Sequence, residues 1–188
     1  MSDLVVKFTQ APFQIKSKDV ALDEAKNLIM SRGISVKPEV PVKTPNIFIC
    51  TAIILVSKLM NKIMHIAPEF ETENNVRNQL AKDIEKMRNI PNNSDVSVAI
   101  IGGIEAKAGD RESDLSHRIY NAAAEVAFDE YNCNGIMACG KKRGDSLENI
   151  KVEGNEITVY TKDFNINNQS LDDRYQSFET HGKIDIMA

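Results

Sequence analysis

The sequence predicts an α/β (α+β) fold: a single layered domain with a mixed β-sheet core flanked by amphipathic helices. Short apolar runs rich in β-branched residues alternate along the chain with stretches in which apolar residues recur every three or four positions. The length of 188 residues suits one domain, and no internal repeat or linker divides it. We expect residues 1–161 to form this domain and the polar residues 162–188 to form a C-terminal tail, or a strap that orders on a partner.

The first quarter of the chain predicts two strands and one helix. Leu4–Phe8 has the composition of a short strand. Ser17 is a suitable cap for a helix that reaches about Arg32 and ends at Gly33. Residues 34–45 contain three prolines, which predicts an extended connection. Asn46–Val56 is rich in Ile, Val, Phe and Thr, and therefore predicts a buried strand.

The segment that follows predicts a β-hairpin. We expect Ser57–Asn61 to turn the chain and Lys62–Ile66 to return as a second strand. A helix through Leu55–Ile63 also fits the apolar residues and remains an alternative. In the hairpin, Cys50 and His65 lie on neighbouring strands, where their side chains can meet.

The central and later parts of the chain predict two helices and four strands. A helix starts at Thr72, and Val96–Ile101 follows as a buried strand. A second helix extends from about Ser113 to Tyr131, Ile136–Cys139 is a short strand, and residues 150–160 form a hairpin. The apolar positions of the first helix are spaced by four, four and three residues: Val76, Leu80, Ile84 and Met87. Those expected to face inward on the second helix are Leu115, Ile119, Ala122, Ala123 and Val126.

Composition narrows the class of protein. The net charge of −4 argues against a nucleic-acid partner. No apolar run reaches the length of about 18 residues that a membrane helix needs, so no membrane insertion is expected. The N-terminus lacks the pattern of a secretory signal, and an odd number of cysteines, three, argues against a disulfide framework. These features predict a cytoplasmic protein, or one secreted without a cleaved signal into a host cytosol.

Three residues around the predicted hairpin form the candidate site. Thr44 stands six residues before Cys50, and His65 stands fifteen residues after it. A thiol is a strong nucleophile only as a thiolate, and a nearby imidazole can produce that thiolate. A third group then fixes the tautomer of the imidazole, as in a catalytic triad. The structural alternative is that Cys50 is a small core residue and His65 a satisfied core histidine.

Other motifs do not predict a metal or a cofactor. Cys133 and Cys139 lack the second cysteine pair or close histidine of a zinc site. Gly102-Gly103 and Gly109–Arg111 lack the residue order of a phosphate-binding loop and are expected to be turns. The basic residues 141–143 are expected to form a solvated turn. They are also a candidate surface on which a partner protein could dock.

The order of these features resembles the CheD family of chemoreceptor glutamine deamidases, whose fold is shared by the catalytic domains of cytotoxic necrotizing factor-like toxins. Thr44, Cys50 and Met64–Pro68 occupy the places of that family's threonine, its nucleophilic cysteine and its histidine segment. Ala99–Gly103 matches a strand that ends in Gly-Gly, and Gly109–Arg111 matches the start of a helix. The likeness covers roughly residues 3–161 and includes two later segments, Gly140–Asp145 and Ile150–Tyr160.

The resemblance implies a hydrolase with a Cys-His mechanism that converts a glutamine side chain of a partner protein to glutamate. Cys50 would be the nucleophile, His65 the general base and acid, and Thr44 the residue that orients His65. No cofactor is implied. The protein substrate would be a chemoreceptor or, for a bacterial effector with a role in virulence, a host regulatory protein.

One departure from the family keeps alternatives open. The family's Gly-Ser directly before the cysteine is Phe48-Ile49 in this chain. A non-catalytic protein-binding module on the same fold is therefore one alternative, and a cysteine transamidase or protease is another. The enzyme interpretation predicts a lowered pKa of the Cys50 thiol, whereas the binding module predicts a buried and unreactive thiol.

Overall fold

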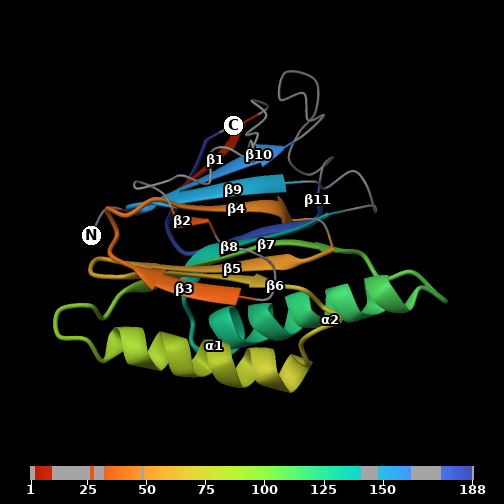
Figure 1. Cartoon of the computed structure of the whole chain (residues 1–188). Helices are drawn as coiled ribbons and strands as arrows, with labels where there is room; N and C mark the ends of the chain where they lie inside the picture. The colour runs from red at the N-terminus through yellow and green to blue at the C-terminus, as the bar shows by residue number, and fades with distance from the viewer. Residues whose placement is uncertain are drawn as a thin grey trace.

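A computed structural model describes residues 3–9, 26–27, 32–47, 49–140, 148–161 and 175–187. Over these residues two mixed β-sheets of six strands each pack face to face, and two helices cover the outer face of one sheet (Figure 1). The predicted layered α+β architecture is confirmed at this level. The second sheet was not expected, because the sequence predicted one sheet core.

The first sheet, sheet A, has the strand order β12-β1-β10-β9-β4-β2. Strand β1 lies between β10 and β12 and is parallel to both, whereas β9 is antiparallel to β10 and β4. The predicted hairpin of residues 150–160 is confirmed by the β9–β10 pairing. The six strands of sheet A are β1 (Leu4–Thr9), β2 (Lys26–Asn27), β4 (Val42–Ile47), β9 (Glu148–Glu153), β10 (Glu156–Thr161) and β12 (Ile184–Met187).

The second sheet, sheet B, has the strand order β11-β8-β7-β5-β6-β3. Its centre is the predicted hairpin, in which β5 pairs antiparallel with β6, so a helix through Leu55–Ile63 is wrong. All seven residues of β5 are buried, as expected for a strand covered on both faces. The strands are β3 (Arg32–Val36), β5 (Thr51–Ser57), β6 (Asn61–Ile66), β7 (Val96–Ile104), β8 (Asn134–Gly140) and β11 (Tyr175–His181).

Two helices pack on sheet B. Helix α1 (Glu73–Arg88) begins after the N-cap Thr72, and its four predicted inward residues are buried. Helix α2 (Arg111–Ala124) continues into a π-helical turn at Glu125–Glu130. The predicted inward face of α2 is confirmed except at Leu115, which is only half-buried. None of the described helices is long and apolar enough to cross a membrane.

The N-terminal region differs from the prediction. The helix expected from Ser17 to Arg32 is wrong at Lys26–Asn27 and at Arg32, which lie in β2 and β3, and its other residues lie outside the described part. Residues 34–45 contribute to two strands, β3 and β4, rather than to a connection alone. Backbone pairing of β3 with β6 outweighs the local helical periodicity. Such pairing joins residues about 30 positions apart and leaves no local pattern.

The C-terminal segment also differs, because residues 175–187 form strands rather than a tail. Strand β11 joins sheet B beside β8, and β12 joins sheet A beside β1. The rings of Tyr175 and Phe178 pack edge-on against Phe8 of sheet A, with centroids 5.7 and 5.9 Å away. These contacts tie the two sheets together at one edge. Residues 162–174 lie outside the described part.

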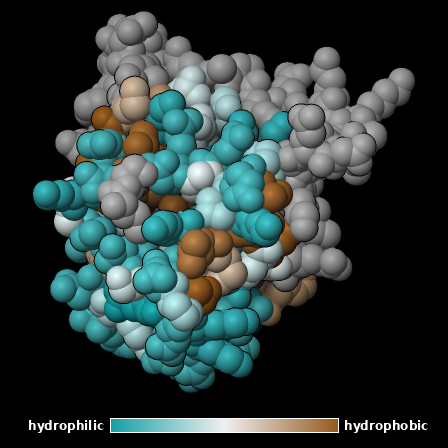
Figure 2. All heavy atoms as spheres, turned by 90° about the vertical axis from the view of Figure 1, so that its left-hand side faces the viewer, coloured by the Kyte–Doolittle hydropathy of each residue, from teal (hydrophilic) through white to brown (hydrophobic). Residues whose placement is uncertain are grey.

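The two ends of the sheets differ. Strand β5 runs from the end where Cys50 lies to the end where the chain turns into β6. At this second end a hollow of about 410 Å³ is lined by apolar residues such as Leu4, Pro38 and Val56. Figure 2 faces this end and shows a small hydrophobic area among hydrophilic residues. The candidate site lies at the other end.

The chain changes sheets at Cys50. The single strand predicted for Asn46–Val56 is wrong, because β4 ends in sheet A, the chain bends at Ile49–Cys50, and β5 begins in sheet B. The Gly103 N–H donates to the Cys50 carbonyl at 2.8 Å. Gly102 has a φ of +102°, and a Cβ at that position would lie 2.5 Å from the Cys50 carbonyl oxygen. Gly102 therefore lets strand β7 approach the bend.

We expect Gly102→Ala to lower the free energy of unfolding by about 3 kcal/mol. The added methyl group would clash with the backbone of Cys50, and alanine is strained at the positive φ of this position. Gly109→Ala is the matched control. Gly109 also has a positive φ, +81°, but no atom lies within 4 Å of the added Cβ. Its cost should be about 1 kcal/mol. Urea unfolding measures both, and equal losses would contradict the importance of the close approach.

Candidate functional site

Thr44 and His65 form a hydrogen bond across the interior between the sheets. Thr44 belongs to β4 in sheet A and His65 to β6 in sheet B, and their Oγ1 and Nδ1 atoms are 2.8 Å apart. The side chains of both residues are buried, with 1% and 3% of the residue exposed. The structure thus places the threonine against the imidazole and fixes the orientation of the ring.

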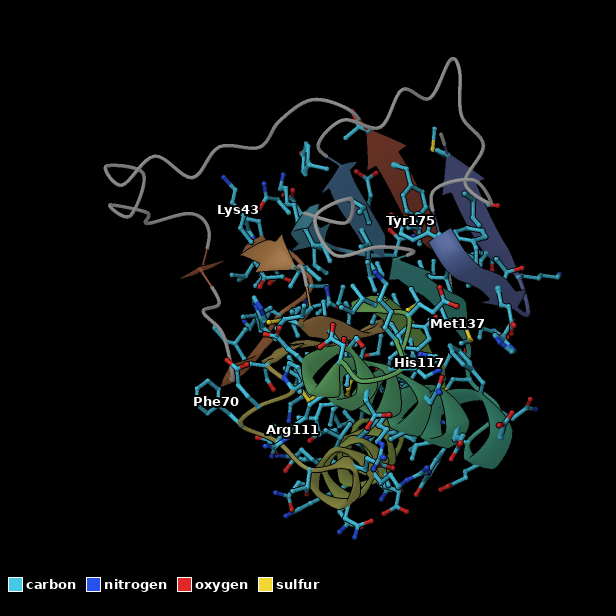
Figure 3. The ribbon with its side chains drawn as sticks, turned by 90° about the vertical axis from the view of Figure 1, so that its right-hand side faces the viewer. Lys43, Phe70, Arg111, His117, Met137 and Tyr175 are labelled. Atoms are coloured by element: carbon cyan, nitrogen blue, oxygen red, sulfur yellow. The ribbon has the colours of Figure 1, made fainter. Side chains whose placement is uncertain are left out.

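Cys50 lies one strand away from His65. In the β5–β6 pairing, Thr51 faces Ile66 and Ala52 faces His65. Cys50 precedes Thr51 and is therefore a diagonal neighbour of His65, at a typical separation of about 7 Å between such positions. Figure 3 faces this end of the molecule, where the turn at Phe70 follows β6 and Arg111 begins α2.

No hydrogen bond joins Cys50 to His65 in the described structure, because the buried Nε2 atom of His65 has no partner there. An unpaired polar atom in a protein interior costs about 1–3 kcal/mol. The structure therefore brings all three predicted residues to one place but connects only Thr44 and His65. In unliganded enzymes, catalytic hydrogen bonds are often long and tighten only in the substrate complex.

Burial sets the protonation states of both groups. The pKa of the Cys50 thiol is raised to about 11, first by burial and then by the carboxylates of Glu69 and Glu112. Burial also lowers the pKa of His65 to about 4. At neutral pH the thiol is protonated and the imidazole neutral. The lowered thiol pKa that the enzyme interpretation predicts is absent, and the buried thiol of the binding-module interpretation is present.

Several residues of this site were not singled out in the sequence. Ser116 of α2 donates from its hydroxyl to the Ile49 carbonyl at 2.7 Å and accepts from the Ile104 N–H at 3.1 Å. The hydroxyl of Thr51, the residue after Cys50, is buried on the helix side of sheet B near Gly103 and has no partner in the described residues. Ser116 carried a usable signal, because a serine on the inward face of an amphipathic helix needs a buried partner.

A cavity near the site does not contain the three candidates. Its volume is about 420 Å³, and it opens between β6 and α1, where Met64, Ile66 and Val76 line it. Met64 and Ile66 face the helices, whereas His65, between them, faces sheet A. The Cys50 site is thus closed in this structure and separate from the helix-side cavity.

The other sequence candidates have structural roles. The Cys133 thiol is buried and accepts from the Arg88 guanidinium at 3.4 Å. Cys139 is buried in β8. Across the described ranges, no three His, Cys, Asp or Glu side chains are arranged to hold a metal ion. The N-terminus of α2 is capped by its own Asp110 side chain, which accepts from the N–H groups of Glu112 and Ser113. The basic residues 141–143 and Phe48 lie outside the described part.

Comparison of the sequence with models of known protein families and with curated proteins found no match. The fold and site therefore define a class only: an α+β protein in which helices cover a two-sheet sandwich that holds a buried Thr–His pair beside a cysteine. The resemblance to the CheD family stays a prediction from the sequence.

The lowered pKa of His65 predicts a pH-dependent stability. The unfolded chain takes up a proton near the ordinary pKa of 6.5, whereas the folded protein resists it down to about 4. The unfolded state thus binds more protons between pH 6.5 and 4. The contribution of His65 to the free energy of unfolding is therefore complete above pH 6.5 and is lost as the pH falls toward 4. From pH 7 to 5 the free energy of unfolding should drop by about 2 kcal/mol on account of His65.

Urea unfolding of the wild type and of His65→Gln at both pH values measures this drop. In His65→Gln the difference between pH 7 and 5 should shrink by the amount attributed to His65. The same replacement at His117, a half-buried residue of α2, is the matched control for removal of a histidine. An unchanged pH dependence in His65→Gln would show that His65 is already solvated in the folded state.

Proposed function

We propose that this protein is a cysteine-dependent protein glutamine deamidase, which resembles the CheD family and converts a glutamine side chain of a partner protein to glutamate. One observation carries the proposal. Thr44 and His65, which are 21 positions apart in the sequence, are joined by Oγ1 and Nδ1 at 2.8 Å. The other ring nitrogen, Nε2, has no partner among the described residues, and His65 is a diagonal neighbour of Cys50 in the strand register. This is the pairing that the resemblance implies.

The tautomer of His65 follows from its proposed role. A general base needs a lone pair on Nε2, so the proton must reside on Nδ1, which then donates to the Thr44 hydroxyl oxygen. The neutral imidazole has this lone pair available at neutral pH, since the pKa of His65 is lowered to about 4. Thr44 therefore acts as a positioning residue.

The first half of the reaction forms a thioester. The Cys50 sulfur attacks the carbon of the glutamine carboxamide while the thiol proton passes to Nε2 of His65. The carbonyl π electrons move to the oxygen, which becomes an oxyanion. When the oxyanion collapses, the carbon–nitrogen bond breaks, and His65 returns the proton to the departing nitrogen. Ammonia leaves and the acyl group stays on Cys50.

The second half releases glutamate. A water molecule attacks the thioester carbon while His65 takes one of its protons. Collapse of this second intermediate breaks the carbon–sulfur bond, and the proton on His65 returns to sulfur. The product is a carboxylic acid, which ionises in water. The partner protein thereby gains one negative charge, and the enzyme returns to its starting state.

The closed resting site sets two conditions on this chemistry. Only 4% of Cys50 is exposed, so a docked partner must open the bend for a side chain to enter. With a pKa of about 11, only about one thiol in 10⁴ is ionised at pH 7, so the thiol proton must leave during the attack. A flexible glutamine on the surface of a docked protein is better suited to this site than a free small molecule.

Burial of the thiol favours a second candidate, a non-catalytic protein-binding module on the same fold. In that case Cys50 and His65 are core residues and no ammonia is formed. A transamidase or protease shares the thioester step but differs in product: an amine replaces water in the former, and the peptide bond is cut in the latter. The products separate these activities.

We expect the wild type to release ammonia from glutamine peptides without cutting or cross-linking them. Cys50→Ala should abolish the release, and His65→Gln should lower kcat/KM at least about 10²-fold. Ammonia assay and peptide mass spectrometry give the readout, with Cys133→Ala as the matched buried-cysteine control. If the wild type makes no ammonia and iodoacetamide labels Cys50 only after unfolding, the binding module is correct.

A further inference from the structure

Two adjoining hollows lie at the end of the sheets opposite to Cys50, where β1 and β7 begin. The first is the apolar hollow of about 410 Å³ at the end of the molecule that Figure 2 faces. The second has a volume of about 280 Å³ and is lined mostly by polar and charged residues. Leu4 and Ser97 line both hollows, so the two adjoin there. One ligand can therefore occupy both, with an apolar part in the first and a polar part in the second.

The apolar hollow is formed by residues that are distant in sequence. Leu4 comes from the start of β1, Pro38 from the turn between β3 and β4, and Val56 from the end of β5. The Gly154 N–H, in the β9–β10 turn, donates to the Pro38 carbonyl at 2.7 Å and fixes one wall. The volume is near the lower end of the range for small-molecule sites, about 300–1,000 Å³, which suits a ligand of modest size.

The polar hollow presents charges of both signs. Two carboxylates, Asp3 and Asp95, and two cations, Arg88 and Lys183, line it, and none of the four forms an ion pair within the described part of the chain. One further cation, the exposed Lys58, lines the apolar hollow. A ligand that carries both an ammonium and a carboxylate complements such a set, because each of its charges finds the opposite sign.

Contacts with the protein hold the guanidinium of Arg88 at the wall of the polar hollow. Its Nη2 atom donates to the Tyr131 carbonyl at 3.0 Å and to the Cys133 sulfur at 3.4 Å. Its Nε atom is buried and has no partner among the described residues. A guanidinium has five N–H groups in a rigid fork, so donors remain for a carboxylate. Since these contacts already orient the group, little side-chain freedom is lost when a ligand binds.

Ser97 places a buried hydroxyl at the junction of the hollows. Only 6% of the residue is exposed, and its hydroxyl makes no hydrogen bond with the described residues. Its neighbours Val96 and Val98 pack on the helix side, so Ser97 faces the interior between the sheets. Buried hydroxyls normally have a partner. Ser57, the other buried serine of the apolar hollow, has one, because its hydroxyl donates to the Met60 carbonyl at 2.6 Å.

We propose that the two hollows form one binding site for a free α-amino acid with a large apolar side chain, such as leucine. The side chain occupies the apolar hollow. The α-carboxylate binds against Arg88 and Lys183, and the α-ammonium group against Asp3 and Asp95. The Ser97 hydroxyl, which is both a donor and an acceptor, bonds to the ligand at the junction. This site is separate from the candidate active site and does not depend on the proposed deamidase function.

Calorimetric titration of the wild-type protein with L-leucine and three analogues tests each part of the site. Alanine lacks the large side chain, leucinamide lacks the carboxylate, and 4-methylpentanoate lacks the ammonium group. Leucine should bind at least about tenfold more tightly than each analogue, because each one loses apolar burial or a charge-assisted hydrogen bond. The inference is overturned if leucine does not bind, or if any of the three analogues binds as tightly.

A pair of serine variants tests the junction. Ser97→Ala should weaken leucine binding about fivefold without lowering the Tm, because the hydroxyl that it removes has no partner in the described residues. Ser57→Ala is the matched control with the opposite pattern. It breaks an existing hydrogen bond, so it should lower the Tm and leave the leucine affinity unchanged. Leucine binding that is insensitive to Ser97→Ala would show that the site is not at the junction.

Two charge variants test the orientation of the ligand. Lys183→Gln should weaken the binding of leucine about threefold but not that of leucinamide, and Asp95→Asn should weaken leucine similarly but not 4-methylpentanoate. Lys86→Gln and Asp129→Asn are the matched controls, since both residues are exposed and line neither hollow. Charge variants that affect leucine no more than these controls do would overturn the assignment of the charged groups.

Discussion

The crossing of the chain from sheet A to sheet B at Ile49–Cys50 is the constraint on which the site depends. Both carbonyl groups at this bend are satisfied by other elements: that of Cys50 by the Gly103 N–H, and that of Ile49 by the Ser116 hydroxyl. The crossing leaves Thr44 in one sheet and places Cys50 beside the hairpin that carries His65 in the other. A segment of only 22 residues, from Thr44 to His65, can therefore form a side-chain hydrogen bond that joins the two sheets.

The same burial that holds the site together makes its resting chemistry neutral. It raises the pKa of the Cys50 thiol and lowers that of His65, so neither group is charged near pH 7. A neutral pair avoids the desolvation cost of a buried ion pair. It also keeps the thiol a weak nucleophile until something changes its surroundings. In the proposed function the approach of a partner would open the site, so the reactivity of the thiol would be coupled to docking.

Local pattern was enough to predict α1, the β5–β6 hairpin and the β9–β10 hairpin, because each is stabilised by neighbours close in sequence. It failed for β3 and β11, which are edge strands stabilised by backbone pairing with distant segments. It also failed at Ile49–Cys50, where an apolar run hides a bend that depends on Gly102 and Gly103. The three site residues followed from the order of features, whereas the acids beside Cys50 required the packing of α2 and the turn after β6.

Burial alone does not distinguish a catalytic cysteine from a core cysteine in this protein. Cys50, Cys133 and Cys139 are all at least nine-tenths buried, so exposure gives the same answer for each. Their neighbours differ. Cys133 has a guanidinium that donates to its sulfur, whereas Cys50 has an imidazole whose Nε2 atom lacks a partner in the described residues. In a purely structural core this nitrogen is an uncompensated cost, because an apolar side chain of similar size would pack there without one. The proposed function, in which a substrate atom completes the hydrogen bond, would explain why a histidine held in place by Thr44 occupies this position.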